Sequence, residues 1–125
     1  MALGLCIVAA GKTTVVAASL FTLSWVHSVE RIEWRETYAV SEAGLVLREA
    51  RVKGSGAGME PGEDARLVGD WWVWQPKRPP IPELDLAASG ATVSAWTLCS
   101  KAGCMELGAS AEAPISLKPC PAEVP

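Results

Sequence analysis

The stretch that decides the fold class is Phe21-Thr-Leu-Ser-Trp-Val-His27. Its apolar and aromatic residues stand at every second position, at 21, 23 and 25, and His27 continues the series. This is the period of a strand with one buried face, whereas a helix repeats its apolar residues every three to four positions. No window of the chain shows the helical repeat with helix caps, so the sequence predicts an all-β fold.

The same alternation continues on both sides of a predicted turn at residues 41–44. The positions on its apolar face are Trp34, Glu36, Tyr38, Val40, Leu45, Leu47 and Glu49. Short β-prone runs follow at residues 71–74, 83–88 and 92–99, and a proline-rich extended connection occupies residues 75–82. Several short strands with frequent turns predict a small, single-domain antiparallel barrel or sandwich.

The N-terminal residues 1–10 are apolar, but no Lys or Arg precedes them and Gly11-Lys12-Thr13-Thr14 interrupts the run. A β-hairpin over residues 4–18, turning at Gly11-Lys12, therefore fits better than a cleaved signal peptide, and no export signal is expected in the chain as written. The compartment stays open. The run is also shorter than the ~20 apolar residues that span a bilayer, so no membrane span is expected. We expect one β domain over residues 1–107 and a flexible Ala- and Pro-rich tail over residues 108–125.

The composition excludes several classes of function. The chain has 125 residues, 50% of them hydrophobic, and a net charge of -3, which is ordinary for one globular domain. It has no basic tract, so we expect no binding to nucleic acid. It has one His and no nucleophile elbow, which argues against a Ser–His–Asp triad. No nucleotide-binding fingerprint is complete, and we expect no cofactor.

Cys99 and Cys104 flank a four-residue turn between two strand-like runs. The spacing predicts that they face each other across a hairpin, within disulfide range. Two reduced thiols fit the same pattern if the compartment is reducing, and the redox state of Cys6 and Cys120 stays open as well. A zinc site would need two further ligands, so no metal site is expected.

The predicted turn also sets a register between the two strands beside it. If Val40 pairs with Leu45, the period of two brings Glu36 opposite Glu49 and Trp34 opposite Arg51, where a cation–π contact is possible. Opposed carboxylates destabilise a sheet unless a shared proton, Arg51, His27, a cation or a ligand offsets them. A binding site is one explanation. A purely structural ion-pair network, with His27 a satisfied rim histidine, is the other.

Two further segments bear on binding. The run Gly54-Ser55-Gly56-Ala57-Gly58-Met59 follows Lys53 directly, and such a run exposes backbone N–H groups to an anion or simply meets the geometry of a tight connection. In the second segment, Trp72 and Trp74 are expected on one face of a strand and Trp71 on the other. Most of this aromatic surface is expected in the core, and an exposed ring would indicate a surface for a partner or a carbohydrate.

Together these segments resemble the family called domain of unknown function 1850. The resemblance covers residues 3–107. It rests on Phe21-Thr-Leu-Ser-Trp-Val-His27-Ser28-Val-Glu30, on Trp34-Arg-Glu36-Thr-Tyr38, on the run from Glu49 to Met59, on Trp71–Trp74, on the proline-rich residues 79–84 and on the Cys99/Cys104 hairpin. It implies genes that often neighbour TRAP-type transporters of carboxylate-like solutes, and frequently an N-terminal hydrophobic export segment, which we do not expect in this chain. It implies no established activity and no catalytic residues.

Three hypotheses follow. The first is a non-enzymatic accessory module that binds a small anionic solute or a transporter component. Its candidate ligand-binding residues are His27, Ser28, Glu30, Trp34, Glu36, Glu49, Arg51, Gly54, Ser55, Gly56, Gly58 and Met59. The second is a small enzyme that uses His27 and the paired glutamates, although directly opposed carboxylates lie too close for an inverting glycosidase. The third is a structural partner-binding domain with its aromatic surface at Trp71–Trp74.

Overall fold

A computed structural model describes residues 3–26, 32–53, 64–86, 95–108 and 114–121 of the chain. The regular elements of these residues are all strands. They are β1 (Leu3–Ala9), β2 (Lys12–Val16), β3 (Leu20–Val26), β4 (Glu33–Ser41), β5 (Gly44–Lys53), β6 (Arg66–Val68), β7 (Trp71–Trp74), β8 (Leu84–Leu86), β9 (Trp96–Ser100), β10 (Gly103–Leu107) and β11 (Ile115–Pro121). The all-β prediction is therefore confirmed.

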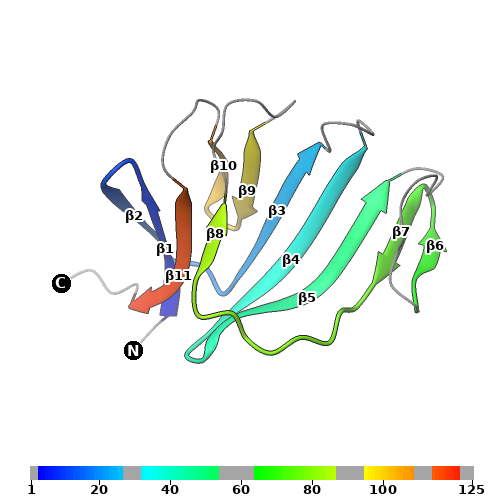
Figure 1. Cartoon of the computed structure of the whole chain (residues 1–125), viewed down its shortest axis with the longest axis horizontal. Coiled ribbons are helices and arrows are strands. Elements are labelled where there is room, and N and C mark those ends of the chain that lie inside the picture. Colours follow the sequence, from blue (N-terminus) through cyan, green and yellow to red (C-terminus); the bar gives the residue numbers. More distant parts are fainter. Residues whose placement is uncertain (1–2, 27–31, 54–63, 87–94, 109–113, 122–125) are drawn as a thin grey trace.

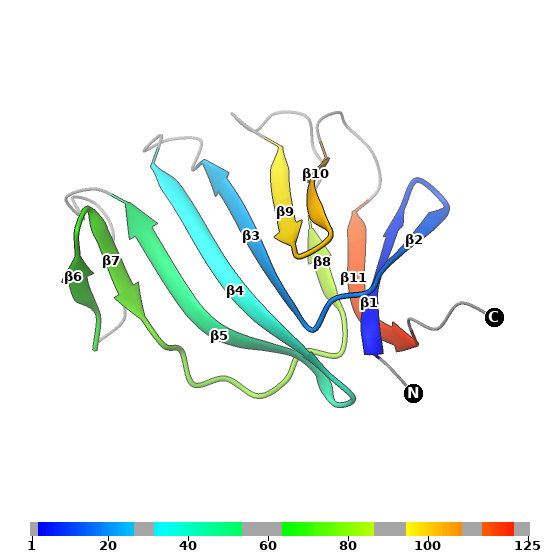
Figure 2. The same ribbon diagram turned by 180° about the vertical axis from the view of Figure 1, so that it is seen from behind.

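The strands form two antiparallel sheets that pack as a sandwich. One sheet has the order β2-β1-β11-β8, and the other has the order β10-β9-β3-β4-β5-β7-β6. The described strands form no closed barrel, so the sandwich is the correct alternative. The larger sheet is wider than the smaller one. Figures 1 and 2 show that β4, β5, β7 and β6 extend beyond one side of the smaller sheet. Among the described strands, one end of the molecule is thus a two-layer core, and the other end is a single curved sheet.

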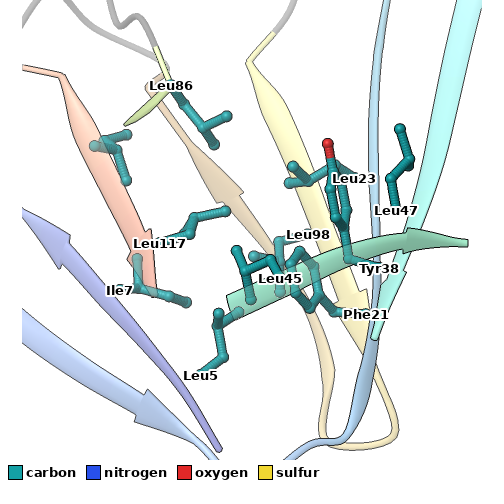
Figure 3. Close-up of a cluster of buried hydrophobic side chains, with 11 residues drawn as sticks. Leu5, Ile7, Phe21, Leu23, Tyr38, Leu45, Leu47, Leu86, Leu98 and Leu117 are labelled. Atoms are coloured by element: carbon teal, nitrogen blue, oxygen red, sulfur yellow. The ribbon is translucent and has the colours of Figure 1, made fainter. Parts of the chain in front are cut away.

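The core lies where the two sheets overlap (Figure 3). Alternate positions of each strand point into it, as expected for two sheets packed face to face. The buried cluster consists of Phe21, Leu23, Tyr38, Leu45, Leu47 and Leu98 from the larger sheet and Leu5, Ile7, Leu86, Ile115 and Leu117 from the smaller one. We call the side of the larger sheet that carries these residues its inner face, and the opposite side its outer face.

The N-terminal hairpin is confirmed, but its turn lies one residue earlier than the predicted Gly11-Lys12, because Lys12 already pairs with Ala9. β1 and β2 pair around the loop Ala10-Gly11, and both loop residues have positive φ, 52° and 76°, as a type I′ turn requires. The strand β1 then pairs along its other side with β11, so the smaller sheet contains both ends of the described chain.

The prediction of a flexible tail over residues 108–125 is wrong for β11. This strand lies between β1 and β8, and its Ile115 and Leu117 have no solvent exposure. A disulfide between Cys6 and Cys120 links it covalently to β1. The predicted pairing of Cys99 with Cys104 is confirmed, and these two cysteines also form a disulfide.

The proline-rich connection links the two sheets. It runs in an extended form from β7 to β8 across the base of the larger sheet (Figure 1). There Ile81 exchanges two backbone hydrogen bonds with Leu45, of 2.7 and 2.9 Å. The turn residue Gly44 allows this approach, because a Cβ atom at its position would lie 2.6 Å from the carbonyl oxygen of Ile81.

Candidate functional site

A β-bulge divides the predicted site between the two faces of the larger sheet. The predicted pairs Val40 with Leu45 and Tyr38 with Leu47 are confirmed. The register then shifts between Thr37 and Tyr38, because Leu47 and Glu49 pair with consecutive residues of β4 and Arg48 between them is unpaired. An extra residue in one strand turns every later side chain of that strand to the other face.

The predicted opposition of Glu36 and Glu49 is therefore wrong. Glu36 pairs with Ala50 on the inner face, and Glu49 pairs with Thr37 on the outer face. The predicted contact of Trp34 with Arg51 is wrong for the same reason, since Trp34 pairs with Val52. The predicted site thus becomes two groups of residues, one on each side of the sheet.

The inner-face group contains a row of four tryptophans that continues from the core toward the uncovered end of the sheet. Ring centroids of Trp96 and Trp25 lie 4.9 Å apart, those of Trp25 and Trp34 lie 6.2 Å apart, and those of Trp34 and Trp74 lie 6.4 Å apart. The contacts are tilted, stacked and edge-on respectively, which are the arrangements that aromatic pairs prefer. Each of the four side chains is partly exposed. We call these residues the tryptophan row.

Glu36 lies between the tryptophan row and the core. Its Oε1 atom accepts a 2.9 Å hydrogen bond from the hydroxyl of Tyr38, whose ring stacks on Phe21 at 5.3 Å. Burial raises the pKa of Tyr38 above its usual value, and the negative charge of Glu36 raises this pKa further. Within the described residues Glu36 has no salt bridge, so the inner face carries a partly buried carboxylate beside aromatic rings.

Within the described part of the chain, two indole N–H groups of the inner face have no acceptor. The Nε1 atoms of Trp34 and Trp72 are buried and make no hydrogen bond. Both residues pair with Val52, from opposite sides, so they lie in one row across three strands. A buried donor without a partner costs about 1–3 kcal/mol, and such a group in a native fold calls for an explanation, for which a bound acceptor is one candidate.

The outer-face group is an ion-pair network around Trp71. Arg51 donates from Nε and an Nη to Glu49, at 2.9 and 2.6 Å, and Arg35 donates to Glu33 at 2.6 Å. The guanidinium carbons of Arg35 and Arg51 lie 4.8 and 5.7 Å from the ring centroid of Trp71, and Lys53 Nζ lies 5.8 Å from it. Glu49 and Arg51 thus fit the structural explanation of a salt-bridge network. The predicted division of Trp72 and Trp74 from Trp71 is confirmed, because Trp71 pairs with outward-facing Lys53.

Several predicted residues lie outside the described part of the chain. These are His27, Ser28, Glu30, Gly54, Ser55, Gly56, Gly58 and Met59. The residues that the structure does describe contain no group of three or more His, Cys, Asp or Glu side chains that could hold a metal ion. They also contain no helix that is long and apolar enough to cross a membrane.

Sequence reasoning missed the tryptophan row as a unit. Trp25 and Trp34 were assigned to apolar faces, but Trp96 and Trp74 come from distant parts of the chain. The available signal was the period of two in β3, β4, β7 and β9, which places one indole each from β3, β4 and β9 and two from β7 on the inner face. Which strands become neighbours is not encoded in that period.

Comparison with known proteins gives a family and nothing more specific. The family model described as a domain of unknown function (DUF1850) matches residues 21–107, a narrower range than the 3–107 of the resemblance. It spans β3 to β10 and so includes the larger sheet except Leu20, together with the tryptophan row and Glu36. No curated protein and no solved structure matches the chain. On the strength of the family model, the chain belongs to the family of domains of unknown function 1850.

Proposed function

We propose that this protein is a non-enzymatic binding module for a small zwitterionic solute, one that carries a cationic nitrogen and a carboxylate. The observation that carries the proposal is the tryptophan row beside Glu36 on the part of the inner face that the smaller sheet leaves uncovered. Clustered aromatic faces with a neighbouring carboxylate suit a quaternary or primary ammonium group, which they hold through cation–π attraction.

The carboxylate of the proposed solute would accept hydrogen bonds from indole N–H groups. Trp34 and Trp72 each offer an N–H without an acceptor in the described structure. An indole nitrogen only donates, and a carboxylate only accepts, so the two are complementary. Glu36 has no salt bridge among the described residues, so a solute that carried a carboxylate alone would be repelled by its negative charge, which the positive charge of Arg78 near Tyr38 offsets only from a distance. This is why the proposal narrows the expected anionic solute to a zwitterion.

The two glutamates that the enzyme hypothesis paired, Glu36 and Glu49, point to opposite faces of the sheet, so no observation favours that hypothesis over a binding module. The link to solute transport is part of the proposal as well. It rests on the gene neighbourhood that the family resemblance implies, and it assigns the module an accessory role beside a TRAP-type transporter.

Isothermal titration calorimetry with three probes tests the proposal. We expect glycine betaine to bind more tightly than choline, which lacks the carboxylate, and acetate, which lacks the cation, to bind most weakly. Trp34→Phe keeps an aromatic ring but removes the N–H, so betaine affinity should fall about tenfold while choline affinity changes little. Glu36→Gln should weaken the binding of both probes that carry a cation, betaine and choline.

The matched control is Trp71→Phe on the outer face, which should leave every probe unaffected. Binding of acetate alone would overturn the zwitterion and restore a simple anion. Absence of heat with all three probes, or an equal loss in the Trp71→Phe variant, would remove the inner face as the binding site.

A further inference from the structure

We infer that the outer edge of β2 is a docking surface for a second copy of this chain. In the described structure β2 is the end strand of the smaller sheet and pairs only with β1. Its first four residues, Lys12 to Val15, are exposed, and Val15 retains 50% of its surface. Figures 1 and 2 show the β1–β2 hairpin on the flank of the molecule, with no labelled strand beyond it.

The hairpin loop determines which backbone groups of β2 point outward. In a β-turn the residue before the loop accepts a hydrogen bond from the residue after it, so Ala9 and Lys12 form a hydrogen-bonded pair. Bonded and non-bonded pairs alternate along an antiparallel ladder. Thr14 and Val16 therefore bond to β1, whereas the N–H and C=O groups of Thr13 and Val15 point away from it.

This arrangement is complementary to itself. When two β2 strands run antiparallel about a two-fold axis at Thr14, Thr13 of one copy lies opposite Val15 of the other. These are the residues with free outward groups, so each of the two pairs exchanges two hydrogen bonds. Lys12 lies opposite Val16 of the second copy, and no like charges face each other. The two smaller sheets then continue as one sheet.

Two of the other sheet edges, β6 and β8, are protected more strongly than β2. β6 and β8 have three residues each, and they contain the charged residues Arg66 and Asp85. β10 carries Glu106. Short length and charge are the usual means by which proteins prevent pairing at an edge. In β2 the only charge is Lys12 at the start, and the remaining four residues are β-branched, which favours strand pairing.

Sedimentation across a range of protein concentrations tests the inference with two variants. The interface is small, so we expect a reversible dimer whose fraction increases as the protein concentration rises from micromolar to millimolar. Val15→Pro removes an outward N–H, which an edge strand tolerates, so the monomer should fold and the dimer should be lost. Val15→Thr keeps the N–H and the β-branch, and should dimerise like the parent protein. Far-ultraviolet circular dichroism checks that both variants fold.

A cysteine pair tests the register independently. Thr14→Cys places two thiols in a non-bonded pair with Cα atoms about 4.5 Å apart, within disulfide range, so mild oxidation should give a covalent dimer. Thr13→Cys separates the two thiols by about 8 Å and should not crosslink. A parent protein that stays monomeric at every concentration, a Val15→Pro variant that dimerises normally, or equal crosslinking at positions 13 and 14 would each overturn the inference.

Discussion

Removal of the hydrogen bond between Tyr38 and Glu36 should lower the stability of the fold by a measurable amount. Tyr38 is 3% exposed, it is the only tyrosine of the chain, and its hydroxyl donates to Glu36 Oε1 at 2.9 Å. Tyr38→Phe keeps the ring that stacks on Phe21 and removes only the donor. Hydrogen bonds to a charged group contribute about 1.5–3 kcal/mol, so we expect the free energy of unfolding to fall by that amount at neutral pH.

The same residue predicts a loss of stability in alkali. Burial and the charge of Glu36 hold the pKa of folded Tyr38 above its unfolded value of about 10. As pH rises, the unfolded chain releases this proton first, so the stabilisation is complete below about pH 10 and falls above it. The slope approaches about 1.4 kcal/mol per pH unit for one such group. Tyr38→Phe should lack this contribution.

Urea unfolding at stepped pH, followed by tryptophan fluorescence, measures both effects. Lysine side chains also titrate in alkali, so the informative quantity is the difference between the parent protein and Tyr38→Phe at each pH. Absorbance of the folded parent protein should show no tyrosinate until well above pH 10. A normal tyrosine titration in the folded state, or a difference that does not narrow above pH 10, would refute the assigned environment of Tyr38.

Two further changes test the frame of the fold. Replacing Cys6 and Cys120 together by Ala should lower the free energy of unfolding by about 3–5 kcal/mol, because the disulfide closes a loop of 114 residues. Urea unfolding without reductant measures this loss. An unchanged urea midpoint would contradict the prediction. Gly44→Ala should lower the free energy of unfolding more than the matched Gly69→Ala does, by about 1 kcal/mol or more in thermal unfolding. A Cβ atom at position 44 would lie 2.6 Å from the Ile81 carbonyl oxygen, whereas a Cβ atom at position 69 would have no atom within 4 Å. Equal losses of stability in the two variants would show that the segment around Ile81 can move away from residue 44 without a free-energy cost.

Local alternation was sufficient to predict most of the fold. The strands β3, β4, β5 and β7 and the N-terminal hairpin all carry a period of two or a turn signal in their own sequence. The bulge was missed because the register was extended from the turn without interruption. Its signal is nevertheless present, since the apolar positions change phase from Leu45 and Leu47 to Ala50 and Val52. A phase change of this kind in a strand indicates an extra residue between the two halves.

The last strand was missed for a different reason. β11 contains two prolines and follows an Ala- and Pro-rich stretch, which is typical of a loop. Its partner β1 lies at the other end of the chain, and a contact over that distance leaves no mark on local composition. The alternation of Ile115 and Leu117 and the presence of a cysteine to match Cys6 were the only signals available.

The bulge also explains how the chain accommodates two glutamates that an uninterrupted register would bring together. An opposed buried pair would need a proton, a cation or a ligand to offset its repulsion. The unpaired Arg48 removes that need, because it sends Glu49 outward to Arg51 and keeps Glu36 inward with Tyr38. No ligand is therefore required to hold the carboxylates together. Binding is inferred instead from the neighbours of Glu36: aromatic rings, one neutral hydrogen-bond donor and, among the described residues, no salt-bridge partner, although the charge of Arg78 reaches the Tyr38 hydroxyl. That environment favours a cation over an anion, which is why the proposed solute carries a positive charge.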